Sequence, residues 1–447
     1  QIDGRGFPGN PSTPGGGLTL DAGTIMIFEP VVTNNGEIVV RATAGGIQMQ
    51  GRAFLAVTDG ESGPGDADIS LNARGNIVAT NLMTLGDVTV TSQTGSVRIT
   101  SGLFGINVGG TGSGIGSLAI DAATSVTMAG AQTNTGGITV LSGTGITNSG
   151  SSLISAAGVS LEGGSGTIQI DATDDNPNDD ERVSVIEATG GDIEVETSGA
   201  VVFGGDLQAS GDILIGADQA VGSVLVDDDR NAATRADRGT LVAGGDVTII
   251  ASQAASSGAT GDITTGDIGG NDVRIDSTDG EVDLGGLVGA DAAGVGSVDI
   301  DTRRVADMSS GLVELRGAST TSGNIDIIAA GGITNTSASL ISAGTIELDG
   351  GGGAISISGG DTAIDATGNV DVDNAGGAVS VTGDIRSRTG SIVVGADMME
   401  VASLTAGDLA AATVVTIESD GLVTTGNIGA GQSSAVTINA GGNVNVG

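Results

Sequence analysis

The chain has 447 residues, of which 82 are Gly, and its 54 acidic residues against 15 basic ones give a formal net charge of −39. It contains no Cys, His, Lys, Trp or Tyr. These absences exclude zinc, haem and iron–sulfur centres of the usual ligation, thiol chemistry, disulfides and His-based catalytic triads. Nucleic acid is disfavoured as a partner because a basic patch and stacking aromatics are both missing.

The N-terminal segment, 1–64, differs from the rest because it holds five of the six prolines. The stretch 7–17, FPGNPSTPGGG, cannot form a ladder strand, since Pro lacks a backbone donor and Gly adds no packing. We interpret residues 1–64 as an N-terminal arm and solenoid cap. Either it only caps or links, or it docks on a neighbouring subunit through Phe7, Pro8, Pro11 and Pro14.

From residue 65 onward one phrase recurs: Gly, any residue, an aliphatic, any residue, an aliphatic. It reads GDVTV at 86–90, GDIEV at 191–195, GDVTI at 245–249 and GNVDV at 368–372. Alternation of apolar and polar residues predicts half-buried strands, and the leading Gly with Asp or Asn predicts a turn before each strand.

The phrases start about 10 or about 20 residues apart with no helical pattern between them, which is typical of a solenoid. We predict an all-β, right-handed parallel β-helix of about 20 rungs, each of roughly 20 residues. An antiparallel sandwich would show similar strands, but it needs larger core residues than a chain with five aromatics, all Phe, provides.

A longer repeat indicates a tandem duplication. Residues 146–170 and 333–357 match at 14 of 25 positions without a gap. We therefore predict two solenoid blocks, 65–270 and 271–447, that form one continuous rod.

Aspartate is the abundant reactive side chain. Asp follows the last inward aliphatic of many phrases, and such carboxylates stacked on successive rungs would repel one another. Two loops are denser in acid. Calcium, which takes six to eight oxygen ligands, is one interpretation of these loops, and a solvated acidic face is the other. The candidate calcium ligands are Asp174, Asp175, Asp179, Asp180, Asp227, Asp228 and Asp229. We predict no other cofactor.

The C-terminal phrase ends at Val444 and Val446 without a polar cap, and the chain begins with Gln1. Open solenoid ends are exposed sheet edges. Either the chain is a piece of a longer protein, or the next subunit covers this end and generates a head-to-tail filament. No apolar run approaches the length of a membrane-spanning helix.

An enzyme is not expected. Sugar-cleaving β-helices hold substrate against aromatic platforms, which this composition lacks. The lyases among them also need a Lys or Arg base in a cleft, and the local basic clusters here are limited to Arg303-Arg304 and Arg386/Arg388.

The GGDITVT-like strands with ITN and LISA turns resemble the shaft of filamentous-haemagglutinin-type secreted adhesins of bacteria, from about residue 65 to the end. The motifs Asn10-Pro-Ser-Thr13 and Asn176-Pro-Asn-Asp179 match that family's secretion domain poorly. The resemblance implies secretion, an extracellular or cell-surface location, and a role in attachment or as a fibre.

From these observations we expect a structural subunit of a bacterial surface filament, whose partners are copies of itself and host, cell or mineral surfaces. The alternative is a monomeric adhesin shaft that displays a binding tip.

Overall fold

The computed structural model describes residues 16–50, 53–58, 67–100, 106–108, 116–133, 135–148, 153–171, 184–227, 238–252, 260–278, 280–290, 296–302, 311–337, 339–395, 401–431 and 435–447. The chain divides into two compact units, residues 1–220 and 221–447. Within the described ranges the secondary structure is all β, and no helix has the length and apolarity needed to cross a membrane.

The strands of unit 1 are β1 Leu18–Ala22, β2 Ile25–Ile27, β3 Val31–Asn34, β4 Ile38–Ala42, β5 Ile47–Met49, β6 Leu55–Thr58, β7 Ile69–Ala73, β8 Ile77–Ala79, β9 Leu82–Thr84, β10 Val88–Ser92, β11 Val97–Ile99, β12 Ile106–Val108, β13 Leu118–Ala122, β14 Val126–Met128, β15 Ala131–Thr133, β16 Ile138–Ser142, β17 Ile146–Asn148, β18 Ile154–Ala156, β19 Val159–Glu162, β20 Ile168–Asp171, β21 Ser184–Ala188, β22 Ile193–Glu196, β23 Ala200–Gly204, β24 Asp206–Ala209 and β25 Ile213–Ile215.

The strands of unit 2 are β26 Ser223–Val226, β27 Leu241–Ala243, β28 Val247–Ser252, β29 Ile263–Thr265, β30 Ile268–Gly270, β31 Val273–Thr278, β32 Val282–Leu284, β33 Val288–Ala290, β34 Val298–Asp301, β35 Val313–Leu315, β36 Ala318–Thr320, β37 Asn324–Ile328, β38 Gly332–Asn335, β39 Ile341–Ala343, β40 Thr345–Asp349, β41 Ala354–Ala366, β42 Val370–Asp373, β43 Ala378–Ser387, β44 Ile392–Val394, β45 Ser403–Thr405, β46 Leu409–Ala411, β47 Val415–Ser419, β48 Val423–Thr425, β49 Ile428–Gly429, β50 Val436–Ala440 and β51 Val444–Val446.

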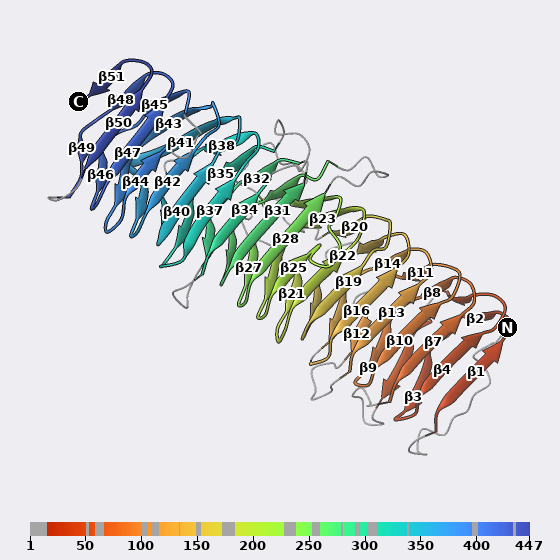
Figure 1. Ribbon diagram of the computed structural model, residues 1–447. Helices are drawn as coiled ribbons and strands as arrows, with labels where there is room; N and C mark the ends of the chain where they lie inside the picture. The colour runs from red at the N-terminus through yellow and green to blue at the C-terminus, as the bar shows by residue number, and fades with distance from the viewer. Residues whose placement is uncertain are drawn as a thin grey trace, which may run out of the picture. The chain divides into compact units, whose positions relative to one another are not determined.

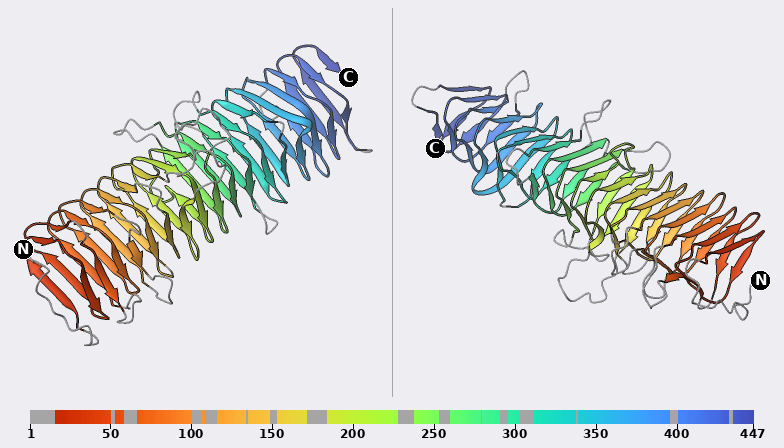
Figure 2. Two further views of the ribbon diagram at one scale, coloured as in Figure 1. Left: turned by 180° about the vertical axis from the view of Figure 1, so that it is seen from behind. Right: turned by 90° about the horizontal axis from the view of Figure 1, so that it is seen from below.

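Each turn of either unit contributes one strand to a first sheet and further short strands to a second sheet. The first sheet contains β1, β4, β7, β10, β13, β16, β19, β22 and β25 in unit 1, and β28, β31, β34, β37, β40, β42, β44, β47 and β50 in unit 2. Strands of successive turns pair in parallel, as Figures 1 and 2 show within each unit. The predicted parallel β-solenoid is confirmed.

The predicted number of rungs was slightly too high. The sequence distance between register partners varies from the short step that joins Ile69 to Val88 to the much longer one that joins Val159 to Ile193. The turns are therefore longer on average than we predicted.

Aliphatic ladders form the core of each unit. In unit 1 the first inward position of the first sheet runs in register through Ile38, Ile69, Val88, Leu118, Ile138, Val159, Ile193 and Ile213, and none of these is more than 2% exposed. Each such side chain stacks on the one a turn away, and burial of each stabilises the coil by about 1.5–3 kcal/mol. Branched aliphatics suit this narrow interior.

The last inward position of these strands is occupied by small residues because the chain turns there. Where the residue is Ser, its hydroxyl bonds to the corner. Ser92 Oγ donates to the Gly75 carbonyl at 2.9 Å and accepts from the Gly95 N–H at 3.2 Å.

The two copies of the 25-residue repeat share one corner geometry among their described residues. Gly164 and Gly351 occupy left-handed backbone with φ of 56° and 55°, and an equivalent corner bond closes each copy. Gly166 N donates to the Gly163 carbonyl at 3.1 Å, and Gly353 N donates to the Gly350 carbonyl at 3.0 Å. This agreement supports a duplication, while the block boundary at residues 270 and 271 stays a prediction.

Candidate functional site: carboxylate faces and turn contacts

Most of the residues predicted to bind calcium or to mediate assembly lie outside the described ranges: Asp174, Asp175, Asp179, Asp180, Asp228, Asp229, Phe7, Pro8, Pro11 and Pro14. Asp227 is half-buried directly after β26. Within the part of the chain that the structure describes, no three acidic side chains are grouped closely enough to hold a metal ion.

Val444 and Val446 lie on β51 and are 45% and 50% exposed. They continue the inward positions of Val423 and Thr425, with which they pair in register. On β50, Val436 is likewise 45% exposed and pairs with the buried Val415. These strands therefore present apolar side chains at positions that are buried in the preceding turn.

The carboxylates that follow the phrases stack only in part. Asp276 and Asp301 are direct register partners, as are Asp349 and Asp373. Asp121 instead pairs with Thr91 and Leu141, so it has no acidic neighbour in its own column. The expected repulsion between rungs thus arises at some of these positions and not at others, with a pair in unit 1 at Glu162 and Glu196.

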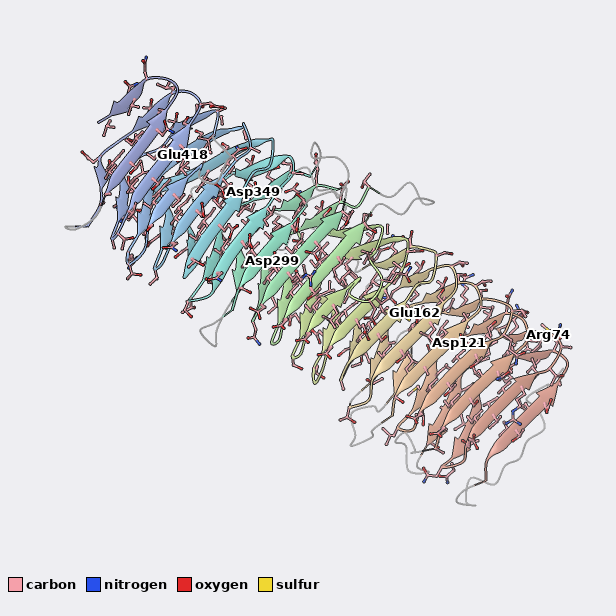
Figure 3. The ribbon with its side chains drawn as sticks, viewed as in Figure 1. Arg74, Asp121, Glu162, Asp299, Asp349 and Glu418 are labelled. Carbon is pink, nitrogen blue, oxygen red and sulfur yellow. The ribbon has the colours of Figure 1, made fainter. Side chains whose placement is uncertain are left out.

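A denser acidic column runs along the outer face of the first sheet of unit 2, between the two inward aliphatics of each strand. Asp299, Asp326, Glu347 and Asp371 are consecutive register partners on β34, β37, β40 and β42. Figure 3 labels Asp299 and Asp349 on this face. This column was not predicted from the Asp that follows each phrase. Its signal is the acidic middle residue of VDI, IDI, IEL and VDV.

Arg274 lies at the beginning of this face, where it is the register partner of Asp299. Arg274 Nε donates to Asp276 Oδ2 at 3.0 Å, and this hydrogen bond raises the pKa of the Arg274 guanidinium. Adjacent carboxylates one rung apart, about 5 Å, repel by about 1 kcal/mol in water-like surroundings. Repulsion within this column therefore lowers the stability of unit 2, and dissolved salt reduces that loss.

In unit 1 the acidic positions are fewer, and Glu196 is the most perturbed of them. Its carboxylate accepts the backbone N–H groups of Asp218 at 3.0 Å and Gln219 at 2.9 Å, and it stacks on Glu162. Burial raises the pKa of Glu196, and the two amide hydrogen bonds oppose that rise.

Two Arg–Asp pairs fasten turns of unit 2 to one another, Arg388–Asp365 across one turn and Arg238–Asp283 across two. Arg388 forms a two-pronged bond to Asp365, with Nε–Oδ1 at 3.0 Å and Nη2–Oδ2 at 2.5 Å, and this holds the pKa of Asp365 below its usual range. Arg238, whose side chain is 13% exposed, bonds both the carbonyl and the carboxylate of Asp283.

The most regular polar feature is a bond between the turns that precede the strands. The side-chain oxygen of an Asp or Asn just before the strand accepts the backbone N–H of the residue one turn later, at 2.6–3.2 Å, and in nine of eleven cases this Asp or Asn directly follows a Gly. The acceptors are Asp68, Asn76, Asp87, Asp192, Asp246, Asp262, Asp267, Asp272, Asn369, Asp384 and Asp408.

This bond explains the Gly of the phrase. A Cβ on Gly211, Gly286 or Gly426 would collide with the carboxylate oxygen of the Asp one turn earlier, which reaches over the glycine to the next N–H. The Gly-Asp pair is thus a contact between turns as well as a turn signal. Nine of the 41 Asp residues of the chain make this contact.

The chain was compared with protein-family models, with curated proteins and with solved structures, and none of the three comparisons gave a significant match.

Proposed function

We propose that this chain is a non-enzymatic structural subunit of an extracellular bacterial surface filament, in which solenoids assemble head-to-tail through their ends and the N-terminal arm. The observation that carries the proposal is the inward aliphatic ladder with in-register parallel pairing in each unit. Successive turns are bonded to one another by backbone hydrogen bonds, so a solenoid of this kind transmits load along its axis. The resemblance of the repeated phrases to adhesin shafts supports the extracellular and bacterial parts of the proposal.

The acidic exterior supports a role in controlled association. Carboxylates on the outer faces repel neighbouring solenoids side by side, so lateral bundling is disfavoured at low salt. Stacking through the ends brings backbone edges and aliphatic side chains together instead.

Electron microscopy of the purified chain tests the proposal, with calcium and with EDTA. Uniform filaments with a regular axial repeat are expected. Loss of filaments in EDTA would assign a bridging role to the acidic loops around residues 174–181 and 227–229. Isolated particles under both conditions would contradict assembly and favour the monomeric adhesin shaft.

Two variants locate the contact. Val446→Lys places a charge on β51 and should abolish filaments, because Lys blunts exposed strand edges. The matched control is Val242→Lys, which changes an outward Val that is 49% exposed on β27, a strand of neither the first nor the last turn, and should leave filaments intact. Deletion of residues 1–17 should also abolish filaments while leaving the solenoid folded.

A further inference from the structure

The two copies of the repeat share a buried Asn, but its side chain makes different hydrogen bonds in each copy. Asn148 and Asn335 occupy the same position at the ends of β17 and β38, and they are 0% and 1% exposed. In the first copy, Asn148 Oδ1 accepts the N–H of Gly130 at 2.7 Å. The residue that corresponds to Gly130 in the second copy is Gly317.

In the second copy this acceptor bond is not made. Asn335 Nδ2 donates to the carbonyls of Ser339 at 2.9 Å and Ser358 at 3.3 Å. These two contacts establish the orientation of the amide, because a flipped amide would point its oxygen at two carbonyl oxygens. Among the described residues, Asn335 Oδ1 is a buried oxygen without a hydrogen-bond partner.

Ser337 accounts for the difference. Its hydroxyl donates to the Arg316 carbonyl at 2.5 Å, whereas the corresponding residue of the first copy is Gly150, which has no hydroxyl. In a trans peptide the carbonyl and the following N–H point in opposite directions. The Ser337 bond therefore constrains the direction of the Gly317 N–H, and φ is 143° at Gly317 against 77° at Gly130.

We propose that the corner formed by Asn335, Ser337 and Ser339 binds a single structural water molecule, which donates a hydrogen bond to Asn335 Oδ1. Buried acceptors in proteins are satisfied, and ordered water supplies the donor where the protein does not. The corner is polar: Ser337 Oγ accepts the Ser339 N–H at 3.2 Å and lies 2.8 Å from Ser339 Oγ. All of these groups are neutral, so a buried cation would lack a compensating charge.

A crystal structure of the full chain with ordered solvent visible tests the proposal. A water within hydrogen-bonding distance of Asn335 Oδ1 is expected, and no such water at Asn148. A metal ion in this place, an empty corner, or a direct Gly317 N–H bond to Asn335 would each overturn it.

The variant Ser337→Gly restores the residue of the first copy. It should let the Gly317 N–H bond to Asn335 Oδ1, expel the water, and slow hydrogen exchange of the Gly317 amide at least tenfold. Ser337→Ala removes the same hydroxyl and covers the case in which the glycine variant folds poorly. Ser342→Ala, on the outer face of β39, is the matched control and should change neither observation. Retention of the water in Ser337→Gly would refute the role assigned to Ser337.

Discussion

The Gly-Asp contact between turns predicts a specific energetic coupling between Asp192 and Gly211. Asp192 Oδ1 accepts the Asp212 N–H at 2.8 Å, and a Cβ on Gly211 would occupy the place of that oxygen. The same Cβ would lie 2.9 Å from the backbone carbon and 3.0 Å from the carbonyl oxygen of Gly191, which cannot move without disturbing the ladder.

The magnitudes follow from these contacts. Asp192→Ala removes one hydrogen bond to an amide that water can still reach, so it should lower the free energy of unfolding by about 0.5–1.5 kcal/mol. Gly211→Ala displaces the carboxylate and also crowds Gly191, so it should cost about 2–4 kcal/mol. The double variant loses the hydrogen bond only once. Its total should therefore be smaller than the sum of the single effects by about 1 kcal/mol.

Urea denaturation followed by far-UV circular dichroism measures these effects, since the chain has no Trp or Tyr for fluorescence. Because long repeat arrays do not always unfold in two states, hydrogen exchange of the amides in β25 should show where the loss occurs. Gly269→Ala is the control, because its Cβ would meet nothing within 4 Å, and it should be neutral or stabilise by up to about 1 kcal/mol. Strict additivity in the double variant would refute the proposed coupling.

Three further outcomes are expected. Glu347→Gln should raise the urea midpoint of unit 2 at low salt, with the gain disappearing in about 1 M NaCl as screening replaces it; Asp121→Asn, which has no acidic register partner, should change nothing. Asp365→Asn should flatten the loss of stability in acid. Arg388 lowers the pKa of Asp365, so the pair stabilises the fold above the unfolded-state pKa and is lost as pH falls through the folded one. Ile300→Ala should cost about 2–5 kcal/mol in urea denaturation, because this side chain is 0% exposed within the ladder.

The fold was largely predictable from the alternation of inward aliphatics. The phrases at 86–90 and 116–120 became β10 and β13, because a period of two places every second side chain in the core. Short strands such as β8 and β9 carry only two inward residues each, too few for alternation to stand out from a turn. The length of each turn could not be predicted from the alternation, because the number of residues between register partners varies from turn to turn.

The polar features were less predictable because they depend on register. The Gly and the Asp of GDIEV at 191–195 read as a turn signal, yet the Asp bonds a residue one turn later, at a spacing that only the paired strands define. The column from Asp299 to Asp371 depends on register in the same way: each acid is ordinary in its own strand and becomes part of a stack only when four turns align.

The acidic residues affect the stability of the fold in two opposite ways, depending on where they lie. At the turns each carboxylate accepts an N–H, so the charge contributes to the stacking of one turn on the next. On the outer face of unit 2 the carboxylates repel one another, and the aliphatic ladder on the inner side of the same strands must offset that repulsion. The same charges also act outside the molecule, because they lie on the outer face of the sheet. In the proposed filament that effect is to keep solenoids apart sideways while their ends remain free to join.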